Sequence, residues 1–128
     1  MKLLLDTHVF IWWACEPDKL SQKVLGLCED AENSLILSVA SVWEMQIKMQ
    51  LGKMKLHLPI KELIENQQEA NNLEVLQIQF NHVMGIDGLP AIHNDPFDRL
   101  LIAQTNTENL TLISKDKKIA EYPVESLW

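Results

Sequence analysis

Short apolar runs alternate along the chain with longer stretches in which apolar residues recur at helical spacing. Half-exposed strands alternate apolar and polar residues, whereas unbroken apolar runs are typical of strands that are buried on both faces, as in parallel sheets. The sequence therefore predicts four buried strands, at residues 3–5, 35–37, 75–78 and 110–113.

Between these runs, apolar residues repeat every three or four positions, which predicts amphipathic helices. The repeat includes Leu20, Val24, Leu27 and Cys28, then Val42, Met45 and Met49, then Ile60, Leu63 and Ile64, and finally Phe97, Leu101 and Gln104. The resulting order, β-α-α-β-α-α-β-α-α-β, is typical of an α/β domain with a central parallel sheet flanked by helices. We expect a single domain over residues 1–128, in which residues 85–94 form the clearest loop.

Composition narrows the functional classes. The 128 residues include 11 basic and 18 acidic side chains, for a net charge of -7. This balance argues against a domain that binds nucleic acid through a basic surface, but not against a nuclease whose metal ion supplies the positive charge. The four glycines have neither P-loop nor dinucleotide-fingerprint spacing, so neither motif is present.

The cysteines and the apolar runs bear on localisation. Cys15 and Cys28 form no CxxC pair, and we expect two buried thiols in a reducing cytosol. The apolar run at the N-terminus ends at Asp6, and no stretch reaches the roughly 18 apolar residues of a membrane span. The sequence therefore predicts a soluble, cytoplasmic protein without a membrane partner.

Acidic residues recur where the predicted strands end. Asp6 follows the first strand, Glu44 lies on the helix after the second, Asp98 opens the helix before the last strand, and Asp116 follows that strand. Open parallel sheets bind ligands beyond the carboxyl ends of their strands. Carboxylates gathered there repel one another unless a proton or a cation lies among them, and oxygen ligands favour Mg²⁺ or Mn²⁺.

Each acid also has a structural alternative. Asp6 suits a helix N-cap, Asp116 suits a turn, and Glu44 completes a Ser-x-x-Glu capping box with Ser41. Asp95 directly precedes a proline, and this order favours a helix cap over a metal ligand.

Neighbouring side chains leave two interpretations open. Lys48 could form an ion pair with Glu44 or contact a phosphate group. Arg99 could pair with an acidic side chain or contact RNA. His8 and His93 are better explained as hydrogen-bonded structural histidines, because no other nitrogen or sulfur ligand accompanies them.

The four tryptophans are expected to pack in the core, although an exposed one would mark a partner surface. They are Trp12, Trp13, Trp43 and Trp128.

Four segments together resemble the motifs of PIN-domain proteins of the VapC toxin group. They are LDTHVFIWW at 5–13, SVASVWEMQIK at 38–48, HNDPFDRLLIAQ at 93–104 and LISKD at 112–116. The resemblance covers residues 2–124, and the four motifs stand in the family's order. Ser114 replaces a frequent threonine and keeps its hydroxyl, whereas Asn94 stands where many relatives carry a basic residue.

The resemblance implies a PIN-like fold and a Mg²⁺- or Mn²⁺-dependent endoribonuclease, the toxin of a type II toxin–antitoxin system. The family's catalytic, metal-binding acids fall on Asp6, Glu44, Asp98 and Asp116, with Asp6 and Asp98 as direct ligands. The implied partners are transfer or ribosomal RNA, a cognate antitoxin and a second copy of the chain.

A function from another class stays open on the residues alone. A non-catalytic module could use the same acidic pocket to bind a basic partner peptide. Such a module has no need of Mg²⁺, so a metal titration distinguishes the two.

Overall fold

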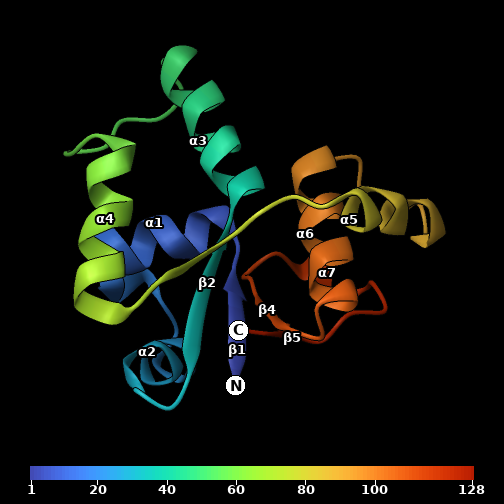
Figure 1. Ribbon diagram of the computed structural model, residues 1–128, viewed down its shortest axis with the longest axis horizontal. Coiled ribbons are helices and arrows are strands. Elements are labelled where there is room, and N and C mark those ends of the chain that lie inside the picture. Colours follow the sequence, from blue (N-terminus) through green and yellow to red (C-terminus); the bar gives the residue numbers. More distant parts are fainter.

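The computed structural model describes residues 1–128 and has a five-stranded parallel sheet at its centre (Figure 1). The strand order is β3-β2-β1-β4-β5, and every neighbouring pair is parallel. This confirms the predicted fold class. The strands are β1 (Lys2–Leu5), β2 (Ser34–Ser38), β3 (Glu74–Leu76), β4 (Thr111–Ile113) and β5 (Ser126–Leu127).

The central strand shows why its apolar run is unbroken. Leu3 and Leu5 pack into a core on one face of the sheet, and Leu4 packs into a second core on the other face. All three side chains are fully buried. Because successive side chains of a strand point to opposite faces, a strand covered on both faces needs apolar residues at every position.

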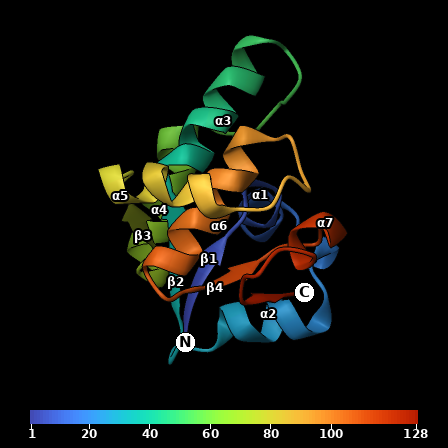
Figure 2. The ribbon, with the colours of Figure 1, turned by 90° about the vertical axis from the view of Figure 1, so that its right-hand side faces the viewer.

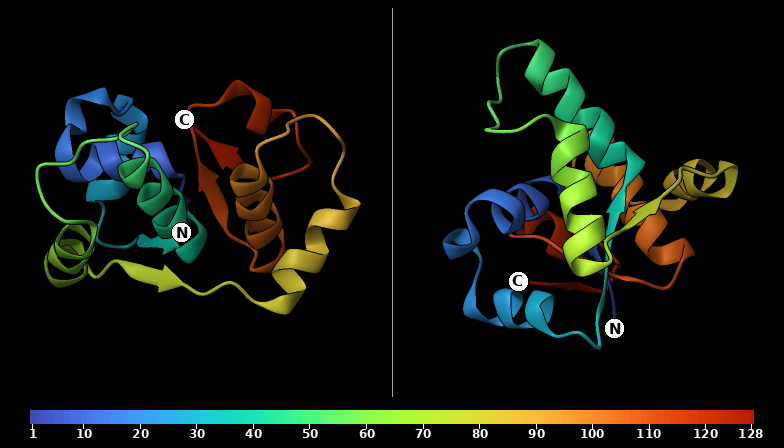
Figure 3. Two further views of the ribbon diagram at one scale, coloured as in Figure 1. Left: turned by 90° about the horizontal axis from the view of Figure 1, so that it is seen from above. Right: turned by 60° about the vertical axis from the view of Figure 1, so that its left-hand side comes forward.

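Helices cover the two faces of this sheet. Figures 1 and 2 show α1, α2 and α4 on one side of it, α6 and α7 on the other, and α5 outside α6. Viewed from above in the left panel of Figure 3, α3 stands between α1 and α6, and it contacts both. The helices are α1 (Thr7–Cys15), α2 (Gln22–Glu29), α3 (Val39–Gln50), α4 (Ile60–Asn71), α5 (Phe80–Met84), α6 (Pro96–Thr107) and α7 (Lys117–Ala120).

The predicted order of elements is right as far as β4, after which the structure adds α7 and β5. Two details were wrong. Residues Gly85–Gly88 of the expected loop form a 3-10 turn, and Cys15 is half-buried, whereas Cys28 is buried as expected. None of the helices combines the length and hydropathy that a bilayer crossing requires.

Candidate active site

The carboxyl ends of β1, β2 and β4 lie at one edge of the sheet, because all three strands are parallel neighbours. A cavity of about 260 Å³ opens at this edge, and none of its lining residues is apolar. The four acids predicted from the sequence all line it, together with Asp95. The full lining is Asp6, Thr7, His8, Glu44, Lys48, His93, Asp95, Asp98 and Asp116.

Asp6 is held at the end of the central strand by the start of α1. It is the N-cap residue of that helix, and its Oδ1 accepts a hydrogen bond from the N–H of Val9 at 2.8 Å. The side chain is only 7% exposed. The predicted capping role is therefore confirmed, and one oxygen performs it while the residue still lines the cavity.

Glu44 reaches the cavity from α3 and is 5% exposed. Its Oε1 accepts a hydrogen bond from the Thr7 hydroxyl at 2.6 Å, and its Oε2 pairs with the Lys48 ammonium at 2.8 Å. The ion pair expected between residues four apart on a helix is thus confirmed. The capping box is wrong, because the N-cap residue of α3 is Ser38, whose Oγ accepts from Ala40 at 3.0 Å.

Two acids come from the first turn of α6. Asp95 is the N-cap residue and accepts hydrogen bonds from the N–H groups of Phe97 at 2.9 Å and Asp98 at 3.3 Å. The structure therefore confirms that Asp95 caps the helix. Asp98 is the third residue of α6, still within the first turn, where its charge is favoured by the helix dipole.

His93 joins two of the acids. Its Nε2 lies 3.1 Å from Oδ2 of Asp98 and 3.1 Å from Oδ2 of Asp116. Its Nδ1 accepts the backbone N–H of Asp95 at 3.1 Å, so that nitrogen carries no proton and Nε2 is the donor. The expectation of a hydrogen-bonded histidine is confirmed for His93, although its partners include two site acids, and is wrong for His8, whose exposed ring makes no side-chain hydrogen bond.

The cavity opposes ionisation of two of its carboxyls, those of Asp6 and Asp98. Burial raises the pKa of Asp6 above its ordinary 3.8, against the lowering effect of the Ser114 and Val9 hydrogen bonds. Burial, followed by the charges of Asp95 and Asp6, raises the pKa of Asp98 to about 7. These shifts follow from desolvation and like-charge repulsion, the conditions that the sequence predicted for converging carboxylates.

Residues beyond the acids brace the loop that precedes α6. Tyr122 Oη accepts hydrogen bonds from the backbone N–H of His93 at 2.8 Å and from Arg99 Nη1 at 3.1 Å. Arg99 also donates to the carbonyl of Pro90 at 2.9 Å, so it pairs with no acid. Tyr122 was missed at the sequence level, because it lies outside the four motifs and only the fold brings it to the loop.

The donor set suits a hard cation. Nε2 of His93 and one carboxylate oxygen each from Asp98 and Asp116 lie within 4.8 Å of one another. Because Nε2 carries a proton, the histidine offers no lone pair there, and oxygens are the available ligands. Buried carboxylates with raised pKa values, in a cavity without apolar lining, fit Mg²⁺ or Mn²⁺.

Comparison with known families gives one match that covers nearly the whole chain. The model of the PIN domain matches residues 3–125. Among curated proteins, the chain is 28% identical to Ribonuclease VapC22 of Mycobacterium tuberculosis over 121 residues, which cover 94% of this chain and 91% of that protein.

Solved structures share the fold at low sequence identity. VapBC2 from Rickettsia felis, crystallised with a DNA fragment from its promoter, superposes with a TM-score of 0.74 at 17% identity, covering 99% of this chain and 98% of that one. VapBC-1 from nontypeable Haemophilus influenzae gives 0.63 at 18% identity, covering 99% and 97% of the two chains.

Proposed function

This chain belongs to the PIN-domain family, and on that premise we propose that it is a metal-dependent endoribonuclease, the toxin of a type II toxin–antitoxin pair. The observation that carries the proposal is the cavity of about 260 Å³ in which five acidic side chains converge. The relative named a ribonuclease and the fold neighbours from VapBC complexes support the same activity.

We assign the metal site to Asp6, Asp98, Glu44 and Asp116, with Asp6 and Asp98 as the direct ligands. Both oxygens of Glu44 are already engaged, by Thr7 and Lys48. Both oxygens of Asp116 are engaged by the Lys118 N–H and His93 Nε2, so these two acids are less free to bind a cation directly. Bound there, Mg²⁺ or Mn²⁺ would polarise a phosphoryl oxygen and lower the pKa of a water molecule.

Other side chains of the cavity would hold the carboxylates and the RNA in place. His93 donates from Nε2 to Asp98 and Asp116 and holds these carboxylates together. A cation bound in the cavity would favour the ionised carboxylate of Asp98, whose pKa is raised to about 7 in the metal-free cavity, so metal binding would release its proton. The exposed lysines beside Asp116 are placed to contact flanking phosphates: Lys115, Lys117 and Lys118.

Partners follow from the same proposal. The substrate would be transfer or ribosomal RNA, and a cognate antitoxin would bind the acidic cavity with a basic segment. We also propose a homodimer, a cytoplasmic location and a single domain over residues 1–128. The exposed apolar side chains of α5, Phe80, Val83 and Met84, are candidates for the contact between copies.

The test is cleavage of purified total RNA with and without Mg²⁺ or Mn²⁺. We expect cleavage that requires the metal, stops with excess EDTA, and leaves 5′-phosphate and 3′-hydroxyl ends. Full cleavage in EDTA would contradict the metal mechanism. No cleavage, combined with metal-independent binding of a basic peptide, would favour the alternative of a non-catalytic binding module.

A further inference from the structure

Two acids of the cavity of about 260 Å³, the acid cavity, are bridged by a hydrogen-bond donor of the chain itself. Nε2 of His93 lies 3.1 Å from Oδ2 of Asp98 and 3.1 Å from Oδ2 of Asp116. The other ring nitrogen accepts the backbone N–H of Asp95 at 3.1 Å, so Nε2 carries the ring hydrogen. That hydrogen points toward the two carboxylate oxygens, into the space that a cation shared by Asp98 and Asp116 would need.

The imidazole is held in this place by contacts on its backbone and on its ring. The backbone N–H of His93 donates to Oη of Tyr122 at 2.8 Å, and Tyr122 is itself only 4% exposed. On the ring, Nδ1 is fixed by the N–H of Asp95, the N-cap residue of α6. Displacing the ring from between the two acids would break the bond at Nδ1 against a backbone that is held in place.

The charge of Glu44 is also balanced from within the chain. Its Oε2 lies 2.8 Å from the ammonium of Lys48, and its Oε1 accepts the hydroxyl of Thr7 at 2.6 Å. A cation beside Glu44 would therefore have to displace Lys48, whose positive charge would repel it. Glu44, like Asp116, has both of its oxygens engaged by groups of the chain.

Asp6 and Asp98 are the two acids that remain available to a cation. One oxygen of each is engaged, Oδ1 of Asp6 by the N–H of Val9 at 2.8 Å and Oδ2 of Asp98 by His93. The charge of Asp6 contributes to the raised pKa of Asp98, as expected for neighbouring carboxyls. Ionised together they carry two negative charges, which one divalent cation neutralises.

We propose that the acid cavity holds a single divalent cation, on Asp6 and Asp98, and that His93 takes the place of a second cation by bridging Asp98 and Asp116. The proposal rests on the proposed nuclease function, since it concerns the same metal site. Enzymes that use two ions hold them roughly 3.5–4 Å apart, at the attacking and leaving oxygens. Here His93 would determine how many cations the site accepts.

A nitrogen ligand is the competing role for His93, because Nε2 and the two carboxylate oxygens lie within 4.8 Å of one another. To bind a cation, Nε2 has to offer a lone pair, which moves the ring hydrogen of the neutral imidazole to Nδ1. That hydrogen would then face the N–H of Asp95, and two donors 3.1 Å apart would lack an acceptor. The contact with Asp95 therefore favours His93 as a donor over His93 as a ligand.

The experiment counts the Mn²⁺ bound per chain by equilibrium dialysis in the absence of RNA, with circular dichroism as the control for folding. We expect about one Mn²⁺ in the wild type and in Asp116→Asn, because Asp116 is not a ligand of that ion. His93→Ala opens the space between Asp98 and Asp116, so this variant should bind about two. The matched control is the double variant His93→Ala/Asp116→Asn, which should return to about one.

Several results would overturn this inference without touching metal-dependent cleavage. They are two Mn²⁺ in the wild type with one lost in Asp116→Asn, an unchanged count in folded His93→Ala, and a nitrogen ligand in the pulsed electron paramagnetic resonance spectrum of the wild type. If His93→Ala does not fold, the counts for the wild type and Asp116→Asn decide. A wild type that binds one Mn²⁺ and cleaves no RNA would remove the proposed function and leave the ion count. A wild type that binds no Mn²⁺ would overturn both.

Discussion

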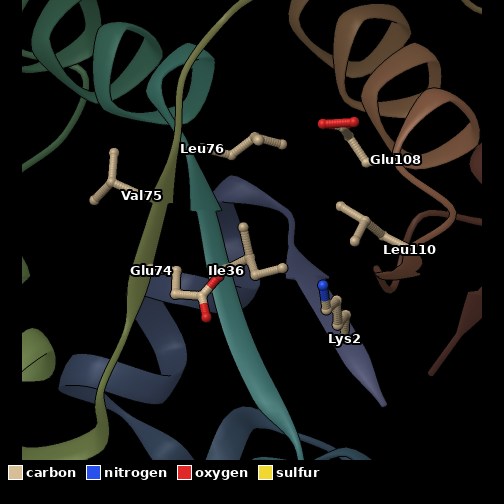
Figure 4. Close-up of a pocket in the computed structure, with 7 residues that line it drawn as sticks. All are labelled: Lys2, Ile36, Glu74, Val75, Leu76, Glu108 and Leu110. Atoms are coloured by element: carbon tan, nitrogen blue, oxygen red, sulfur yellow. The ribbon is translucent and has the colours of Figure 1, made fainter.

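Two of the cavities on this molecule are similar in size but differ in how far their charged side chains are exposed to water. The acid cavity, about 260 Å³, has no apolar lining and buries carboxylates beside one another. The second, about 290 Å³, has an apolar floor and three exposed charged side chains, Lys2, Glu74 and Glu108 (Figure 4). Volume therefore does not identify the site, whereas the burial of like charges does.

The difference arises from where each cavity lies in the fold. The acid cavity lies at the carboxyl ends of the strands, where Asp6 and Asp98 are fixed by the beginnings of α1 and α6. The second cavity takes its residues from strand positions such as Ile36 and Leu76 and from Glu108 just after α6. The charged side chains of the second cavity are exposed to water, which screens them from one another. A cation bound there would therefore relieve little repulsion.

The largest difference between the two cavities should appear when one acidic side chain is neutralised in either of them. Asp98→Asn and Asp6→Asn each remove the charge of a proposed metal ligand at nearly constant volume, and we expect RNA cleavage to fall by more than about a hundredfold. Glu74→Gln in the second cavity should cleave as the wild type does. Single-turnover cleavage in Mn²⁺ measures all three, with circular dichroism as the control for folding. Retained cleavage by Asp98→Asn would contradict the assignment.

The raised pKa of Asp98 predicts how pH changes the stability of the metal-free protein. Between pH 4 and 7 the folded state holds a proton that the unfolded state has released, so the free energy of unfolding falls as pH rises. The rise from 3.8 to about 7 corresponds to at most about 4 kcal/mol.

Urea unfolding from pH 4 to 8 in EDTA measures this effect. Asp98→Asn should flatten the decline, because the titrating group is gone, and Glu74→Gln should leave it unchanged. An equally steep decline in Asp98→Asn would assign the pH dependence to other groups.

A smaller effect is expected at Asp95, whose oxygen caps α6. Asn caps helices as well as Asp does, so Asp95→Asn should preserve the fold and change cleavage less than about threefold. The Asp95 charge contributes to the raised pKa of Asp98, so this pKa should be lower in Asp95→Asn. The fall of the free energy of unfolding with rising pH should therefore end at a lower pH in this variant than in the wild type. Loss of cleavage as large as in Asp98→Asn would instead make Asp95 a ligand.

Most of the fold could be predicted from the sequence because burial on both faces imposes a strong pattern. Leu3, Leu4 and Leu5 are apolar without interruption for that reason. The final strand, Ser126–Leu127, has only two residues and therefore no pattern. The 3-10 turn at Gly85–Gly88 resembles a loop in its glycines and was predicted as one.

The candidate site was predictable in its acids but not in their connections. Strand ends and motif order placed Asp6, Glu44, Asp98 and Asp116 at one edge of the sheet, where they line one cavity. The donation from His93 to Asp98 and Asp116 depends on the loop braced by Tyr122, which sequence spacing cannot reveal. The exposure of Trp43, which unlike the other three tryptophans packs into neither core, likewise depends on how α3 packs against α6.

Thermal unfolding with and without Mn²⁺ tests the central claim most directly, because it detects the metal at the acid cavity without relying on any RNA substrate. At a hundredfold excess over its Kd, Mn²⁺ should stabilise the wild type and Glu74→Gln by about 2.7 kcal/mol. Asp6→Asn and Asp98→Asn should be stabilised much less, although removal of one charge makes each more stable without metal. An identical Mn²⁺-induced shift in the wild type and in both cavity variants would show that these carboxylates do not form the site.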